Sequence, residues 1–203
     1  MTRKLAVSVY ILILVSSLNI FKPFATKNVY ADSLKTYLSE ESLLLAYGNG
    51  FVGESHRSYR PFLTIIHLGF DAHRLLPSIF PVSNGRLTLY LEPQYNRVVK
   101  PAGNYEFGIG VGLEYRLTIT NGLDGYFLLG SGLHYISFDS KYQSGGFNFN
   151  DNIGSGVYIH VGKCSAVNIG FRFRHISNAD LNMPNEGINS YLFVAGYSVF
   201  LNR

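Results

Sequence analysis

Residues 105–117 read YEFGIGVGLEYRL, and bulky apolar side chains alternate with glycine and charge along them without a break. A period of two is typical of a β-strand, because successive side chains point to opposite faces. One face is apolar with aromatic residues at its ends, and the other holds three glycines and three charged residues. Water-facing strand positions seldom need so many glycines. The segment therefore predicts a strand whose apolar face meets lipid and whose glycine-rich face points inward.

The same alternation recurs along the chain. It is clearest in segments 66–71, 86–92 and 191–201, and further candidate strands are 42–52, 126–138, 147–161 and 165–177. About eight alternating segments with aromatic ends are the signature of a small transmembrane barrel, whose closure pairs every backbone amide in lipid. We therefore predict an all-β fold, an eight-stranded antiparallel transmembrane β-barrel of the outer membrane. A soluble β-sandwich is the alternative.

The first 31 residues differ in character from the rest. Arg3 and Lys4 precede an apolar run from Leu5 to Phe21, and a small residue, Ala31, ends a cleavage pattern before Asp32. This order is typical of a cleavable signal peptide. We expect residues 1–31 to be removed and residues 32–203 to form the barrel, which would carry a lipid-facing active site. A signal-anchor helix is the alternative, because the apolar run approaches the length of a membrane span.

The net charge of +4 gives no support for nucleic-acid binding. The excess comes from four basic residues of the first 31, which contain no acidic residue, and the remainder holds 13 basic and 13 acidic residues. A basic field over the folded part is therefore absent, and no nucleic-acid partner is expected. Cys164 is the only cysteine, so no intramolecular disulfide forms, and no cysteine follows the cleavage pattern as in a lipoprotein.

Charged residues recur on the predicted inner faces. An eight-stranded barrel has a lumen that side chains fill, so these charges are expected to pair there. With both ends in the periplasm, 120–122 and 162–164 are short periplasmic turns, whereas the link at 75–85 is unusually long. Three histidines, at 67, 134 and 160, also fall on the inner face and show no metal-ligand spacing, so no metal site is expected. The inner-face charges are Arg86, Glu92, Glu106, Glu114, Arg116, Arg172 and Arg174.

The pattern breaks in segment 165–177. Every second residue of this segment is expected to face lipid, and this series ends with His175 and Ser177. Both are polar, whereas a purely structural barrel would place apolar side chains there. Counting back along the last strand puts Asn189 on the same face. Residues two apart on a strand have Cα atoms about 6.6–6.8 Å apart, so the imidazole can reach the hydroxyl. The pair permits Ser–His nucleophilic catalysis, although a His and Ser at a barrel rim are also common as a hydrated interfacial pair.

The run 171–179, FRFRHISNA, and the following 184–190, PNEGINS, closely resemble the C-terminal motif of the lipid A 3-O-deacylase (PagL-type) family. The resemblance implies an eight-stranded outer-membrane barrel with its active site on the lipid-facing exterior. It also implies a serine esterase that hydrolyses the ester at position 3 of lipid A, the membrane anchor of lipopolysaccharide, without a cofactor. The resemblance is specific over the C-terminal part of the chain; elsewhere it rests on the signal, the length and the strand count.

Carried over by position, the resemblance makes His175 the general base and Ser177 the nucleophile, with Asn178 and the following turn near the oxyanion hole. Where the family motif has a Glu that completes the triad, this chain has Asn189. An Asn carbonyl can orient the imidazole but cannot neutralise its protonated form. Glu186 and Asp180 lie in the same link and are alternative third members.

Other functions also fit the sequence. A non-enzymatic barrel, structural, adhesin-like or a degenerate family member, is the chief alternative, and the Asn at 189 favours it. Another outer-leaflet acyl enzyme would share the surface site but act on a different ester. Lipid A and outer-membrane lipid are the expected partners, and both a monomer and a homodimer fit the sequence. Four basic residues in external links could meet the lipid A phosphates or be solvated loop charges: Arg57, Arg60, Arg97 and Lys100.

Overall fold

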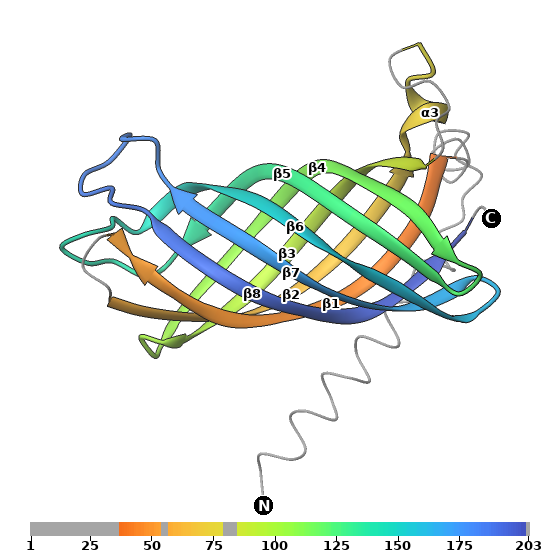
Figure 1. Cartoon of the computed structure of the whole chain (residues 1–203). Helices are drawn as coiled ribbons and strands as arrows, with labels where there is room; N and C mark the ends of the chain where they lie inside the picture. The colour runs from red at the N-terminus through yellow and green to blue at the C-terminus, as the bar shows by residue number, and fades with distance from the viewer. Residues whose placement is uncertain (1–36, 54–56, 79–84, 202–203) are drawn as a thin grey trace, which may run out of the picture. The chain divides into compact units, whose positions relative to one another are not determined.

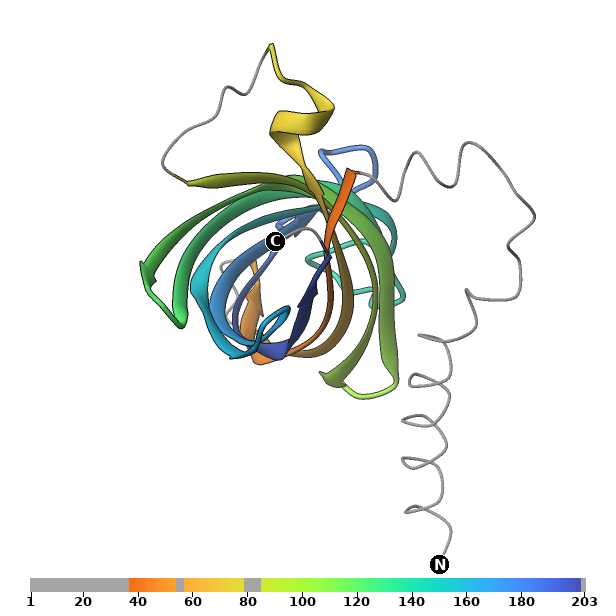
Figure 2. The same ribbon diagram turned by 90° about the vertical axis from the view of Figure 1, so that its right-hand side faces the viewer.

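The computed structural model describes residues 37–53, 57–78 and 85–201, and these form a closed antiparallel barrel (Figures 1 and 2). The signal-peptide prediction for residues 1–31 lies outside the described residues. No helix in the described ranges is both long and apolar enough to cross a membrane. The elements are β1 (Leu38–Val52), β2 (Arg57–Asp71), α3 (Ala72–Leu75), β3 (Arg86–Lys100), β4 (Asn104–Thr120), β5 (Leu123–Ile136), β6 (Gly146–Gly162), β7 (Ser165–Ser177) and β8 (Ile188–Phe200).

Each strand pairs with its neighbours in sequence, and β1 pairs with β8 to close the barrel. The closing ladder runs from Glu40 opposite Phe200 to Val52 opposite Ile188. Closure leaves no free strand edge, which is the condition for crossing lipid with strands. The prediction of an all-β, eight-stranded antiparallel barrel is confirmed.

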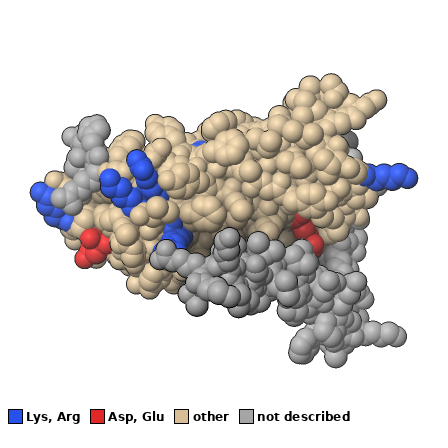
Figure 3. Space-filling view, turned by 90° about the horizontal axis from the view of Figure 1, so that it is seen from below, with Lys and Arg blue, Asp and Glu red and all other residues tan. Residues whose placement is uncertain are grey.

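The outward face of the wall is apolar. Exposed side chains follow the predicted parity, as in β4, where Phe107, Ile109 and Val111 are each more than two-fifths exposed. On the face shown in Figure 3, most Lys and Arg side chains lie toward one end of the barrel, and the rest of the wall carries few charges. Aromatic rings of β4 and β5 stack near one end, with the Phe107 and Tyr135 centroids 4.9 Å apart. The wall has the apolar band and aromatic girdle of a membrane barrel.

The lumen holds six of the seven charges that the inner-face parity predicted; the seventh, Arg86, is partly exposed at the start of β3. Arg172 donates to both carboxylate oxygens of Glu92 at 2.7 and 2.8 Å, and Arg174 does the same to Glu106 at 2.7 and 3.2 Å. Arg116 pairs with Glu114 and with Glu40. The sequence pattern does not place Glu40 in the lumen, because it predicts a first strand from residue 42, whereas β1 begins at Leu38.

The lumen histidines also bond carboxylates, which accounts for their inner-face positions. His67 Nδ1 lies 2.8 Å from Glu92, His134 Nε2 lies 3.1 Å from Glu106, and His160 Nε2 lies 2.8 Å from Asp124. An apolar cluster packs at the end of the lumen where β7 ends and β8 begins. It includes Tyr59, Val98, Ile136, Phe138, Ile176 and Ile188. Side chains therefore fill the lumen, as expected for a barrel of this size.

The links distinguish the two ends of the barrel. Asn121–Gly122 and Lys163–Cys164 are two-residue turns at one end, as predicted. The links 137–145 and 178–187 lie at the other end, which we term the outer end because two-residue turns are typical of the periplasmic end of outer-membrane barrels; the long link 72–85 is an exception at the turn end. The long link after β2 begins with α3, whose first turn is capped by Asp71 accepting from the Arg74 N–H at 3.0 Å. Residues 79–84 of this link lie outside the described ranges.

Several strands extend beyond the predicted segments, as β2 and β3 do, and the bounds of β5 differ from the prediction at both ends. The segment 126–138 corresponds to β5, which begins earlier, at Leu123, and ends at Ile136. Phe138 lies beyond the end of the ladder, and its ring keeps the inward parity of the strand and packs edge-on against Tyr59 with centroids 5.5 Å apart.

Candidate active site

The candidate site lies where β7 ends and β8 begins, at the outer end of the barrel (Figure 1). Arg174 and Ile176 point inward and are fully buried, so His175 and Ser177, which alternate with them, face outward. His175 stands directly opposite Asn189 in the β7–β8 ladder. The structure thus brings His175 and Asn189 together on the lipid-facing wall, as the strand parity predicted.

A hydrogen bond fixes the orientation of the imidazole. Nδ1 of His175 lies 2.8 Å from Oδ1 of Asn189. Because an amide oxygen only accepts, Nδ1 carries the hydrogen and Nε2 is left with its lone pair. Nε2 is the nitrogen that a general base uses in a Ser–His pair, so this tautomer is the one that the chemistry requires.

Ser177 is the last residue of β7, two positions beyond His175 on the same face. Within the part of the chain that the structure describes, its hydroxyl has no hydrogen-bond partner. The bond between the hydroxyl and Nε2 is therefore not formed. Catalytic hydrogen bonds are often long without substrate and tighten when it binds, so the shared face and the spacing are the informative features.

Gly187 supports the ring of His175 from the β7–β8 link. Its φ is +78°, and a Cβ added there would lie 2.7 Å from Cε1 of His175. Its N–H donates to Oε1 of Gln143 at 2.8 Å, and its carbonyl accepts from the Gly53 N–H at 2.9 Å. Sequence reasoning does not single out Gly187, although a glycine two residues before Asn189 is a usable signal. Bonds from two other external links therefore hold the backbone on which the imidazole rests.

Asn178 is fully buried at the start of the link after β7. Its backbone N–H donates to Oδ1 of Asn185 at 2.9 Å, and its side-chain amide donates to the Asn182 carbonyl at 2.6 Å. Ala179 and Asp180 follow in the left-handed region, with φ of 52° and 61°. Non-glycine residues with such φ values cost free energy and tend to cluster at functional sites. The turn is thus tightly organised, and the backbone N–H of Asn178 is already engaged within it.

The two acidic alternatives for the third member lie elsewhere. The exposed side chain of Glu186 packs against Gly53 in the β1–β2 link. Asp180 accepts from Nδ2 of Asn185 at 2.9 Å. Of the three candidates from the sequence, Asn189 is the one that bonds His175 in the described structure. Sequence reasoning also misses Asn185, which ties Asn178 and Asp180 together across the link.

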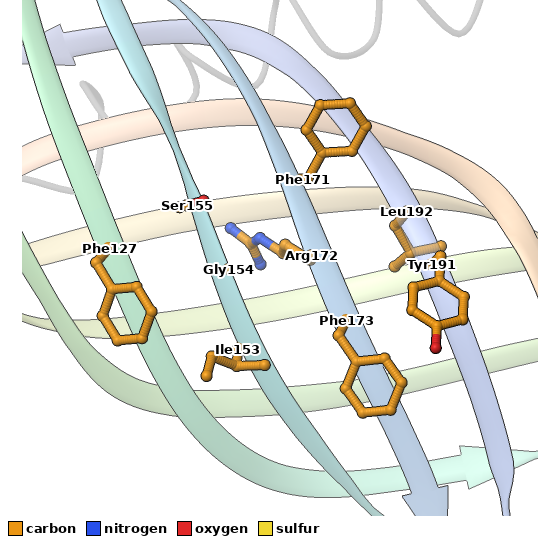
Figure 4. A pocket seen from close by; sticks show the side chains of 9 residues that line it. All are labelled: Phe127, Ile153, Gly154, Ser155, Phe171, Arg172, Phe173, Tyr191 and Leu192. Carbon is orange, nitrogen blue, oxygen red and sulfur yellow. The ribbon is translucent and has the colours of Figure 1, made fainter.

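A groove of about 320 Å³ lies on the outward wall over β5 to β8 (Figure 4). Phe173, which borders it, is two residues before His175 on the same face of β7. Gly154 and Ser155 are the small residues beneath it, and Figure 4 shows aromatic rings on either side of them. The groove residues are Phe127, Ile153, Gly154, Ser155, Phe171, Arg172, Phe173, Tyr191 and Leu192. Its apolar walls suit a hydrocarbon chain that extends from the candidate site into the membrane.

These features define a class of protein, the small β-barrels of the outer membrane, here with a hydrogen-bonded His–Asn pair and a serine on the lipid-facing wall. The model of the lipid A 3-O-deacylase (PagL) family matches residues 67–198, and the chain belongs to this family. A search of curated proteins found no match.

Two solved structures illustrate the likeness. The outer membrane enzyme PagL shares 26% sequence identity with a TM-score of 0.58, over 78% of this chain and 98% of that chain. Neisserial surface protein A has the same TM-score of 0.58 at 16% identity, over 80% of this chain and 96% of that chain, and this likeness concerns the fold alone. The family and the fold assign the protein to the outer membrane.

Proposed function

We propose that this protein is a serine esterase that hydrolyses the 3-O-linked acyl chain of lipid A in the outer leaflet. The observation that carries the proposal is the bond between His175 Nδ1 and Asn189 Oδ1, which leaves Nε2 available on the face that Ser177 shares. Family membership and the 26% identity to PagL support the substrate class.

In the proposed reaction, Nε2 of His175 takes the hydroxyl proton of Ser177 while Oγ attacks the ester carbonyl. The tetrahedral intermediate collapses as the imidazolium returns the proton to the leaving sugar oxygen, giving a free 3-hydroxyl and an acyl-serine. A water molecule, deprotonated by His175, then attacks the acyl-serine and releases the fatty acid. Ser177 recovers its proton from the imidazolium, so no proton is lost over the cycle.

The outward position of the site suits a substrate that stays in the membrane. Lipid A would approach sideways in the leaflet, and its scissile acyl chain would lie in the groove beside Phe171 and Phe173. Holding the chain there orients the ester toward Ser177, and such positioning contributes a large part of many enzymes' rate enhancement. No acyl chain has to leave the apolar phase.

The test compares lipid A from Gram-negative cells with and without the protein by mass spectrometry. We expect the protein to remove one hydroxyacyl chain and to leave a free 3-hydroxyl. Loss of a chain from phospholipid with lipid A unchanged would instead identify a different outer-leaflet acyl hydrolase.

A non-enzymatic barrel is the second candidate function. The observation that favours it is the amide at position 189, because an amide orients the imidazole without adding the negative charge of the family's carboxylate. Unchanged lipid A in cells that carry folded, surface-localised protein would support this candidate and contradict the esterase.

A further inference from the structure

Three exposed basic residues lie close together at the outer end of the barrel. Arg60 on β2 and Arg97 and Lys100 on β3 are exposed, and on the face shown in Figure 3 most basic side chains lie at one end of the barrel, together with an acidic side chain. The side chain of Arg57 lies outside the described residues. Elsewhere on the rim, β6 and the links after β5 and β7 carry exposed acidic residues and a single exposed lysine, Lys141, among the described positions, and one of the acidic residues, Glu186, reaches Gly53 in the β1–β2 link. The acidic residues are Asp139, Asp151, Asp180 and Glu186.

The three basic residues are neighbours on one surface, which we term the β2–β3 basic patch (Arg60, Arg97 and Lys100). Arg60 stands opposite Lys100, and Arg97 stands opposite Phe62, two residues along β2 from Arg60. None of the three has an ion-pair partner among the described residues. Like charges opposite one another on a sheet repel and destabilise it. An anionic ligand from outside the protein would relieve this repulsion.

The depth of the patch in the membrane matches a phosphate. Tyr95, two residues deeper on β3, is 60% exposed, and Tyr105 stands opposite Arg97 on β4. The ring of Tyr105 stacks with those of Phe107 and Tyr135, and aromatic girdles of this kind mark the interface between lipid chains and head groups. Cations just beyond the girdle therefore lie at the level of lipid head groups.

The patch and the candidate active site lie at similar depth. Arg97 is three residues from the outer end of β3, and His175 is two residues from the outer end of β7. Between them the wall carries uncharged exposed residues, including Asn49 and Tyr191. Three strand spacings separate β7 from β2, which amounts to about 14 Å along the wall. A phosphorylated disaccharide head group bridges a span of this length.

We propose that the β2–β3 basic patch binds a phosphate of lipid A, so that the head group lies across β8 and β1 while its ester faces Ser177. The proposal rests on the proposed function for the orientation of the substrate, but binding of the phosphate is independent of catalysis. Arg and Lys both bind phosphate through charge-assisted hydrogen bonds, and Arg adds a bidentate geometry.

The experiment measures lipid retention by native mass spectrometry on the full chain in detergent micelles, in a Ser177→Ala background that prevents turnover. The probes are lipid A with both phosphates and the same lipid A after phosphatase treatment. We expect Arg60→Gln with Arg97→Gln to lower retention of the phosphorylated form by about ten-fold or more, and to leave retention of the dephosphorylated form unchanged. The matched control is Lys141→Gln, which removes one positive charge from the rim outside the patch and should retain both forms normally.

Equal retention of phosphorylated lipid A by the parent and the double variant would overturn the proposal. An equal loss of dilauroyl phosphatidylglycerol, offered as a third probe, would show a general anionic-lipid surface and overturn the assignment to lipid A. If the active parent releases no fatty acid from lipid A while the phosphate-dependent retention behaves as expected, the proposed esterase fails and the phosphate site stands.

Discussion

The two faces of β7 carry polar side chains under opposite conditions. On the inner face, Arg172 and Arg174 each make a bidentate pair with a carboxylate across the lumen. On the outer face, His175 makes one hydrogen bond, and the hydroxyl of Ser177 makes none within the described residues. A buried charge needs a partner to be tolerated. A reactive group, in contrast, must keep a lone pair or a hydrogen available for its substrate. On the structural face of the strand the polar side chains therefore have their ion-pair partners, whereas on the candidate catalytic face they keep unused hydrogen-bonding groups.

The largest effect is expected on the outer face. Ser177→Ala and His175→Ala each remove one partner of the nucleophile–base pair, and we expect deacylation to fall by at least about 10³-fold, with little change in barrel stability. The measurement is the rate of fatty-acid release from lipid A in vesicles, with heat-modifiable migration in electrophoresis as the check of folding. Parent-like rates in both variants would refute the site assignment.

On the inner face of β7, in contrast, a substitution should lower the stability of the barrel. Arg172→Met leaves Glu92 buried without its guanidinium partner, and breaking a buried pair in this way costs about 3–5 kcal/mol. We expect this loss in urea unfolding of the vesicle-inserted protein. Adding Glu92→Gln removes the uncompensated charge and should recover part of the stability. A parent-like unfolding midpoint for Arg172→Met would mean that the lumen pairs do not stabilise the barrel.

Gly187→Ala tests whether the backbone at Gly187 positions the imidazole of His175. The added Cβ would lie 2.7 Å from Cε1 of His175, so the ring must shift, and we expect kcat to fall by about 10²-fold with little change in KM. Gly103→Ala is the matched control, because Gly103 also has a positive φ, of +85°, but no atom lies within 4 Å of the point that its added Cβ would occupy. Both variants should lose about 1 kcal/mol of stability, whereas Gly103→Ala should keep its activity. Equal activities would show that Gly187 does not position the ring.

Local alternation predicts most of the fold, and its failures have a common cause. Period-two patterns place the wall and the lumen correctly and bring His175 and Asn189 to one face. Glu40 is missed because it belongs to the start of β1, where its role depends on Arg116, 76 residues away in sequence. The contacts of Gly187 with Gln143 and Gly53 are likewise made between separate links. Strand parity is a local property, whereas the bonds that organise the site join distant segments.

The smallest effect concerns Asn189, where the chain differs from its family's motif. Asn189→Ala removes the acceptor for Nδ1, so the imidazole loses its fixed tautomer, and we expect a rate loss of about ten-fold. Glu186→Ala should be nearly silent, because the Glu186 side chain packs against Gly53, and the bond to the imidazole comes from Asn189 in the described structure.

Asn189→Glu tests the role of residue 189 through the pH dependence of the reaction rate. Ser177 can be activated only while His175 is neutral, so activity falls at low pH as the imidazole takes up a proton. A carboxylate in place of the amide stabilises the protonated imidazole, and more alkaline conditions are then needed to keep it neutral. The acidic limb of the rate profile should therefore move to higher pH in Asn189→Glu, and the plateau should rise because the carboxylate also stabilises the imidazolium formed during attack. Rate profiles of the parent, Asn189→Ala, Asn189→Glu and Glu186→Ala on lipid A measure both effects. A damaging Glu186→Ala beside a silent Asn189→Ala would transfer the orienting role to Glu186.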